Sequence, residues 1–324
     1  MRKVLLATTA LVAMGGVSAA AADVSLSGVG RYTYSSWSDN ETTGDDTTGT
    51  TDVLFTVSGA STADSGMTMG GSITLLNGDT DAQSIYVSDD WGKLTFGGAD
   101  AARGNHNSAS VGAMPGSNGD QTFANVATNS RVGNGANDKT VIKYTSPDFN
   151  GLVVNAAVTN AGGKADEEGD ISSWAVSYGT DFEGASVALD YASASTANKA
   201  GTGTTTDADS IGATVTVDDL TIMVGSANTD KSDGTSKIAT TDYGVDYAVN
   251  SDLTVEAWAV SSKNTGTGAG ANDKLSMTQI GATYTVTPGL TVSLTSRSFD
   301  YKDASTPSLD NKGDGVTARV TVTF

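Results

Sequence analysis

The arrangement of apolar side chains limits this chain to one class of fold. After residue 22 no apolar stretch approaches the length of a membrane-spanning helix, about 20 residues. Apolar and polar side chains alternate instead: in "ASVALDYA", Val187, Leu189 and Tyr191 share one parity, and small or polar residues occupy the other. A period of two residues is that of a β-strand with two unlike faces. The chain is therefore predicted to be all-β.

Segments with this alternation recur along the whole chain, and we count sixteen of them. The predicted strands cover residues 24–37, 52–63, 67–77, 83–89, 93–99, 140–147, 151–160, 172–180, 185–194, 209–218, 220–228, 239–249, 253–262, 276–286, 290–299 and 315–324. An even number of strands is typical of closed antiparallel barrels in outer membranes.

The connections between these segments alternate in length. Short turns such as "DDWG", "DFEG" and "TPG" are separated by longer polar loops such as "SDNETTGDDTTGT" and "KDASTPSLDNKGDG". One end of the structure is thus expected to carry tight hairpins and the other long loops. This asymmetry is typical of an up-and-down barrel inserted into a membrane from one side.

A soluble β-sandwich and a β-solenoid are the alternatives to a membrane barrel. A sandwich must pack its apolar faces together, and the many Ser, Thr and Gly residues of the opposite parity would leave a large polar exterior around a thin core. A solenoid requires a fixed repeat, which the sequence lacks. A barrel in lipid, with its apolar parity outside and its polar parity around water, fits the pattern best.

The first 22 residues are expected to be a cleaved signal peptide. Arg2 and Lys3 precede an apolar run, and the small-residue segment "SAAAAD" follows it. A transmembrane anchor is the alternative, but the apolar run is short and no stop-transfer pattern follows it. Residues 23–324 are therefore predicted to form the mature barrel.

Charge and composition exclude several classes of function. The full chain has a net charge of −19, and loss of the two basic residues of the leader leaves 16 basic against 37 acidic residues, a net charge of −21. This charge argues against nucleic acid as a partner. The chain has no cysteine and one histidine, His106, so a disulfide framework or a histidine-rich metal site is not expected.

Together with the leader and the strands, three features carry a resemblance to a known family. They are the opening "ADVSLSGVGRY", the long connection from about residue 100 to 139, and the terminal aromatic residue Phe324. In these the chain resembles Gram-negative general porins, in particular those of the alphaproteobacterial type. The resemblance implies a homotrimer of sixteen-stranded antiparallel β-barrels that lets small hydrophilic solutes and ions diffuse across the outer membrane. It also implies that the third external loop, here residues 100–139, folds inward and constricts the channel.

Charged residues of the polar parity are the candidate pore lining. Arg31, Arg297 and Arg319 lie on the first, fifteenth and last predicted strands, so closure of the barrel should bring them together as a basic patch. Lys143 on the sixth strand is expected to extend this basic side. The candidates on the long loop are the acidic residues Asp100, Asp120 and Asp138 and the basic residues Arg103 and Arg131; Asp190, Asp246 and Glu256 are acidic candidates on the wall. Given the net charge, we expect weak cation preference, since acidic rings favour cations.

Aromatic residues near the strand ends are candidates for the interfacial girdles of a membrane barrel. Tyr34, Trp37, Trp91 and Phe149 occupy such positions, with simple packing or turn filling as the alternative. Phe324, at the end of "GVTARVTVTF", is expected to close the barrel against the first strand, and the resemblance implies that the outer-membrane assembly machinery reads it.

No cofactor is expected, although acidic loop segments such as "DNKGDG" contain enough oxygen ligands for calcium, which would bridge the loops to lipopolysaccharide. The partners implied are outer-membrane lipid, lipopolysaccharide and small polar solutes. Three rival functions stay open. A substrate-specific channel would need a luminal aromatic track, for which Tyr86, Trp258 and Phe299 are scattered candidates; a barrel enzyme would depend on His106; and a surface adhesin would need only the acidic loops.

Overall fold

The computed structural model describes residues 23–39, 46–98, 102–103, 126–128, 130, 140–159, 170–197, 204–307 and 310–324. The expected signal peptide, residues 1–22, lies outside this part of the chain. Within the described ranges, no helix is long and apolar enough to cross a membrane.

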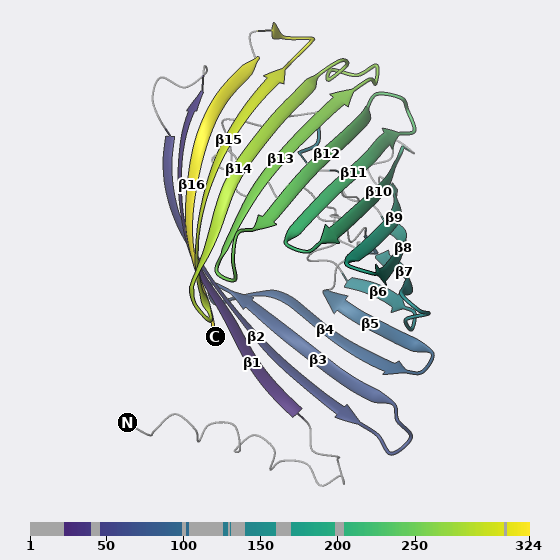
Figure 1. Cartoon of the computed structure of the whole chain (residues 1–324). Coiled ribbons are helices and arrows are strands. Elements are labelled where there is room, and N and C mark those ends of the chain that lie inside the picture. Colours follow the sequence, from purple (N-terminus) through teal and green to yellow (C-terminus); the bar gives the residue numbers. More distant parts are fainter. Residues whose placement is uncertain are drawn as a thin grey trace.

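The described residues form sixteen strands that close into one antiparallel barrel (Figure 1). Each strand pairs with its neighbours in sequence, and β1 pairs with β16 to close the ring. The strands are β1 (Asp23–Asp39), β2 (Asp46–Thr62), β3 (Thr68–Leu76), β4 (Asp79–Asp89), β5 (Gly92–Gly98), β6 (Thr140–Thr145), β7 (Leu152–Thr159), β8 (Ile171–Phe182), β9 (Ala185–Ala197), β10 (Thr205–Val217), β11 (Leu220–Lys231), β12 (Lys237–Ala248), β13 (Leu253–Asn264), β14 (Lys274–Thr287), β15 (Leu290–Lys302) and β16 (Asn311–Thr323). The predicted up-and-down barrel is confirmed.

We call the end of the barrel reached by odd-numbered strands the loop end, and the opposite end the turn end. All sixteen predicted strands are present, and the larger differences in their bounds are found at the loop end. There β2 begins at Asp46 rather than residue 52, and β10 begins at Thr205 rather than residue 209. These extensions consist of Asp, Thr, Gly and Ala, so the alternation that marks a strand in the sequence fades while backbone pairing continues.

One connection at the loop end is a tight turn rather than a long loop. Asn77 and Gly78 join β3 to β4 with φ angles of 51° and 98°. Positive φ at both central residues is the type I′ hairpin geometry that Asn-Gly sequences favour. The Asn77 side-chain oxygen also accepts a hydrogen bond from the Val53 backbone amide of β2 at 2.8 Å. The predicted alternation of loop lengths therefore has an exception here.

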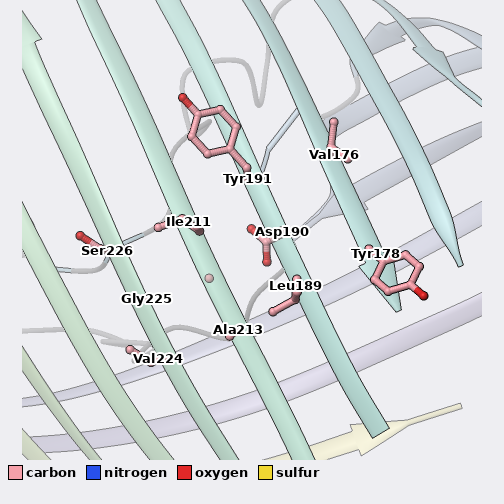
Figure 2. A pocket seen from close by; sticks show the side chains of 11 residues that line it. Val176, Tyr178, Leu189, Asp190, Tyr191, Ile211, Ala213, Val224, Gly225 and Ser226 are labelled. Atoms are coloured by element: carbon pink, nitrogen blue, oxygen red, sulfur yellow. The ribbon is translucent and has the colours of Figure 1, made fainter. Parts of the chain in front are cut away.

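The outer face of the barrel is apolar over most of its height. Large side chains of the outward parity are exposed on strands around the ring; among them are Leu26, Ile73, Ile85, Ile142, Ile211, Ile280 and Leu294. On β8–β11 outward side chains such as Leu189, Tyr191 and Ile211 border a shallow apolar groove (Figure 2). A continuous exposed apolar surface of this extent is expected on a barrel that faces lipid.

The prediction that the inward parity is polar is wrong for parts of β1, β11 and β13–β15. Inward side chains there form an apolar cluster, which we call the luminal cluster: Trp37, Met223, Trp258, Val260, Leu275, Met277, Phe299 and Tyr301. The rings of Trp37 and Phe299 lie 6.2 Å apart, and a side chain at Gly315 would collide with the Trp37 ring. Toward the loop end of β13–β15 the outward residues are polar, and they include Ser261, Ser276, Thr278, Ser296 and Ser298.

Of the predicted girdle residues, Tyr34, Trp91 and Phe149 are exposed, as an interfacial position requires. Trp37 is not, because its side chain is only 3% exposed and belongs to the luminal cluster. The prediction failed for Trp37 because β1 turns its odd-numbered residues inward, with Arg31, Thr33 and Ser35, and Trp37 shares their parity.

Candidate channel lining

The long segment between β5 and β6 is attached to the inner wall at two separate places. Near its start, Ala102 is fully buried, and its backbone amide donates a hydrogen bond to Ser173 Oγ on β8 at 3.1 Å. The methyl group of Ala102 packs among small inward side chains of β6–β9: Val141, Ala157, Ala175 and Ala192. Small residues at these positions leave room for the backbone of the segment to lie close to the wall.

The second attachment lies on β12 and β13. Ser130 donates two hydrogen bonds to the Asp242 carboxylate of β12, from Oγ at 2.8 Å and from its backbone amide at 3.3 Å. The Ala127 backbone amide donates to Ser262 Oγ of β13 at 3.0 Å, and Val126 packs against the luminal cluster. Asp242 and Ser130 are both 0% exposed, so this contact is sealed from water.

These two attachments identify which side of the wall the segment occupies. Ser173, Asp242 and Ser262 all carry inward parity, because their sequence neighbours Trp174 and Tyr243 are exposed on the outer face and Ser262 lies on the parity of Val260. In the ring of sixteen strands, β13 lies eight places from β5. The described residues of the segment therefore lie inside the barrel, against parts of the wall that are far apart.

The structure places the three candidate arginines on adjacent strands. Arg297 is on β15, Arg319 on β16 and Arg31 on β1, which pairs with β16. The Arg319 Nε atom donates to Thr33 Oγ1 of β1 at 3.1 Å, and the Arg297 Nε atom donates to Gln279 Oε1 of β14 at 2.6 Å. Arg31 is exposed and the other two are half-buried. On β16, Arg297 pairs with Gly315 and Arg31 with Thr321, so the three arginines form a diagonal row along the wall rather than one compact patch. Arg31 also faces Asp52 of β2 directly.

The remaining candidates are distributed differently. Lys143 has inward parity on β6, five places from β1, so the structure does not bring it into the group of arginines. Arg103 is half-buried beside the first loop attachment. Asp100, Asp120, Asp138, Arg131 and the enzyme candidate His106 lie outside the described residues.

Two acidic wall candidates lie next to the arginines rather than across from them. Asp246 of β12 and Glu256 of β13 are direct cross-strand neighbours. Gln279 Nε2 donates to Glu256 Oε1 at 2.6 Å, and the same amide accepts from Arg297. Gln279 therefore joins the acidic and basic groups. It is a functional candidate that the sequence analysis missed, although its inward parity on the strand between Glu256 and Arg297 was the available signal.

The described residues contain no metal cluster, and their apolar groove lies on the outer face. In the described parts of the chain, no group of three or more His, Cys, Asp or Glu residues is placed to hold a metal ion. The groove on β8–β11 faces outward and is lined almost wholly by apolar side chains, so it does not belong to the water path (Figure 2).

Comparison with known proteins agrees with this geometry. The family model described as Gram-negative porin matches residues 7–304. A search of curated proteins found none that matches the sequence.

Solved structures with this fold are distant in sequence. The anion-selective porin of Comamonas acidovorans superposes with a TM-score of 0.66 at 16% identity, covering 94% of this chain and 100% of its own. The outer membrane channel DcaP of Acinetobacter baumannii gives 0.68 at 12% identity, covering 94% and 97%. OmpT of Vibrio cholerae, in its trimer form, gives 0.65 at 13% identity, covering 94% and 100%.

The closed barrel, its apolar outer face and its charged lumen are the parts that a passive channel through a membrane needs. The family match spans nearly the whole of the barrel. The chain therefore belongs to the Gram-negative porins, and it is an outer-membrane β-barrel that forms a channel for passive diffusion of small hydrophilic solutes and ions.

Proposed function

We propose that the segment between β5 and β6, about residues 100–139, crosses the lumen and sets the narrowest part of the channel. The observation that carries this proposal is the pair of hydrogen bonds from Ser130 to Asp242, which tie the segment to a wall strand seven places from β5. A long loop inside a compact structure is expected to be functional. The segment is attached to β8 near its start and to β12 and β13 further along. Attachment at these two places supports a constriction with a constant cross-section rather than a loop that moves at the channel entrance.

The charges of the described lumen support weak cation preference for this channel. The arginines are concentrated on β15, β16 and β1, while carboxylates on inward parity occur on several other strands: Asp52, Asp190, Asp246 and Glu256. The net charge of the mature chain, −21, raises the local concentration of cations near both mouths. The anion-selective structural neighbour shares the fold, so the fold itself does not decide selectivity.

Reversal potentials in planar bilayers test this proposal. With purified mature protein and a KCl gradient, we expect a modest potential whose sign corresponds to K⁺ permeating faster than Cl⁻. The preference should weaken in concentrated salt, because the Debye length falls from about 10 Å at 0.1 M to about 3 Å at 1 M. A potential of the opposite sign would refute cation preference, and an absence of conductance would refute the channel itself.

We further propose a homotrimer with no enzymatic role and no resident cofactor. The trimer form of the OmpT structure supports the assembly state, and stepwise insertion should appear as conductance steps in groups of three. Diffusion through water requires no cofactor. Conductance should therefore be unchanged by EDTA, and a change would favour calcium bound by the acidic loops.

A substrate-specific channel receives little support from the aromatic residues. Trp258 and Phe299 have inward parity but are 8% and 2% exposed, so solutes cannot slide over their rings. Tyr86 has the Lys93 ammonium 4.1 Å from its ring centroid. These residues do not form a continuous exposed track along the described lumen.

A further inference from the structure

Five consecutive strands each carry an exposed lysine near the loop end, where these strands lie side by side (Figure 1). We call these residues the lysine row: Lys237 on β12, Lys263 on β13, Lys274 on β14, Lys302 on β15 and Lys312 on β16. Each lies an even number of residues from an exposed outward side chain of its own strand; in the same order these are Tyr243, Val255, Ile280, Leu294 and Val316. The lysine row therefore belongs to the outer surface of the barrel and not to the water path.

Two members of the lysine row have no counter-charge. Lys263 lies directly opposite Lys274, and Lys274 lies directly opposite Lys302. Like charges in this arrangement destabilise a sheet. Lys302 forms ion pairs with two aspartates, at 3.1 and 3.5 Å, and each end member of the row lies opposite an aspartate. Among the described residues, no carboxylate lies within ion-pair distance of Lys263 or Lys274.

Lys274 lies at the height of lipid head groups. It is six residues from Ile280, which is 65% exposed in the middle of β14. At about 3.4 Å per residue and a strand tilt of about 40°, this separation spans about 15 Å along the membrane normal. The edge of an apolar band about 25 Å tall lies about 12 Å from its centre. Lys274 is thus just beyond the hydrocarbon, and Lys263 on the next strand differs from it in height by about 3 Å.

The outward side chains below the two lysines change in the order in which a lipid molecule changes. Ser261 and Ser276, each two residues nearer the middle of its strand, are exposed and lie opposite each other. Further along, Ile280 and Leu294 are exposed apolar side chains. Ammonium groups, hydroxyl groups and apolar side chains therefore follow one another down the wall, as a phosphate, its polar linkage and an acyl chain do in a lipid.

The geometry points to Lys263 and Lys274 as a binding site for a phosphorylated lipid of the outer leaflet. Directly opposite residues have Cβ atoms about 4.5–5.5 Å apart, so one phosphate can contact both ammonium groups and offset their repulsion. The acyl chains then lie along the apolar wall below. A soluble polyanion is disfavoured by the net charge of the mature chain, −21. The contact is direct, unlike a calcium bridge from the acidic loops.

Lipid binding to the purified mature protein in a neutral detergent tests the inference. The probes are lipid A with two phosphate groups and the same lipid A after removal of both, and native mass spectrometry counts the lipid molecules bound. With EDTA present, the protein should bind the phosphorylated form at concentrations several-fold lower than the dephosphorylated form.

Variants of the two lysines identify the site. Lys263→Gln and Lys274→Gln should each raise the concentration of phosphorylated lipid needed for half-saturation about fivefold, the contribution of one lysine near an anionic membrane surface. Arginine at both positions should preserve binding. Lys93→Gln, at inward parity on β5, removes the same charge from the inner face and should leave binding unchanged.

The folding of the variants is checked without lipid. There Lys263→Gln and Lys274→Gln should be at least as stable to heat as the wild type, because each removes a like-charge repulsion. A loss of lipid binding in these variants is then not a loss of structure.

Three results would overturn the inference. Equal binding of the two lipid forms by the wild type would show that the wall does not recognise phosphate. Undiminished binding by a variant with glutamine at both positions would place the site elsewhere. Binding that is absent in EDTA and restored by calcium would assign the contact to the acidic loops.

Discussion

Asp242 shows how one buried carboxylate can hold a long loop. It lies at inward parity on β12, fully buried, and accepts two hydrogen bonds from Ser130. The segment "TTDYGVDY" identifies it only as one of two carboxylates on the polar parity. Asp246 was predicted to line the channel and Asp242 was not, because nothing in a local pattern shows where a distant loop attaches.

Replacement of Asp242 should loosen the long segment. In Asp242→Ala both hydrogen bonds from Ser130 lose their acceptor, at a cost of about 1–3 kcal/mol for donors left buried. We expect larger and noisier single-channel conductance, with a small decrease in thermal stability. Asp242→Asn keeps one acceptor oxygen and should give an intermediate result. Conductance and noise that are unchanged in Asp242→Ala would show that the attachment does not determine the width of the channel.

Phe324, which follows β16, contacts both β1 and β2 at the point where the ring closes. Its backbone exchanges hydrogen bonds with Gly28 at 2.7 and 3.0 Å, and its ring passes over Gly28 to meet Phe55 of β2 edge to face, with 5.5 Å between the centroids. A side chain at Gly28 would collide with the Phe324 ring. Glycine is therefore the residue that lets the aromatic ring cover β1.

Deletion of Phe324 should impair assembly more than conduction. The variant loses the two backbone hydrogen bonds and the aromatic contact, so we expect a several-fold decrease in folded protein in the outer membrane, detected by heat-modifiable migration in electrophoresis. The channels that do assemble should conduct normally, because the ring faces outward. Phe55→Ala removes the aromatic contact but keeps the terminus and should have a smaller effect. A normal yield of the deletion variant would contradict this role.

The two halves of β14 are suited to different surroundings. Toward the loop end its outward residues are polar, including Ser276, whereas Ile280 in its middle is 65% exposed on the same outward parity. The polar outward surface of β13–β15 at this height indicates that these strand ends project beyond the hydrocarbon, which in outer-membrane barrels meets an apolar band about 25 Å tall. Part of the luminal cluster, including Leu275, Phe299 and Tyr301, lies inside this projecting wall and gives it a core.

Lysine substitutions on β14 test this interpretation. Ile280→Lys should lower the free energy of unfolding by about 2–4 kcal/mol, the cost of a cation near the bilayer midplane. Ser276→Lys, four residues away at the same parity, should cost about 0–1 kcal/mol. Reversible urea unfolding in the presence of lipid vesicles measures both values. Equal costs would show that Ser276 also lies in hydrocarbon.

At the level of the elements, the sequence predicted the strands well and their surroundings less well. The period of two is a local property, so all sixteen strands were found. The polarity of each face also depends on height along the barrel axis, which a local pattern does not record. For that reason Trp37 was assigned to the membrane interface, although its ring lies in the lumen over Gly315.

For the whole molecule, closure of the ring made part of the lumen predictable. Since the last strand must pair with the first, arginines far apart in sequence, such as Arg31 and Arg319, were expected on adjacent strands, and the structure places them there. The role of Gln279 and the destination of Ser130 were not predictable in this way. They depend on side-chain contacts across strands and on the path of a long loop, and neither leaves a periodic signal.

The pairing of β1 with β16 also determines when, relative to its synthesis, the barrel can close. Thr33 pairs with Arg319, so the ends of the chain must meet across almost its entire length. Until the ribosome has supplied the last strand, every shorter product keeps two open sheet edges, which hydrocarbon does not tolerate. Synthesis must therefore end before insertion is complete, and a chain truncated before β16 is expected not to form a closed barrel in the membrane.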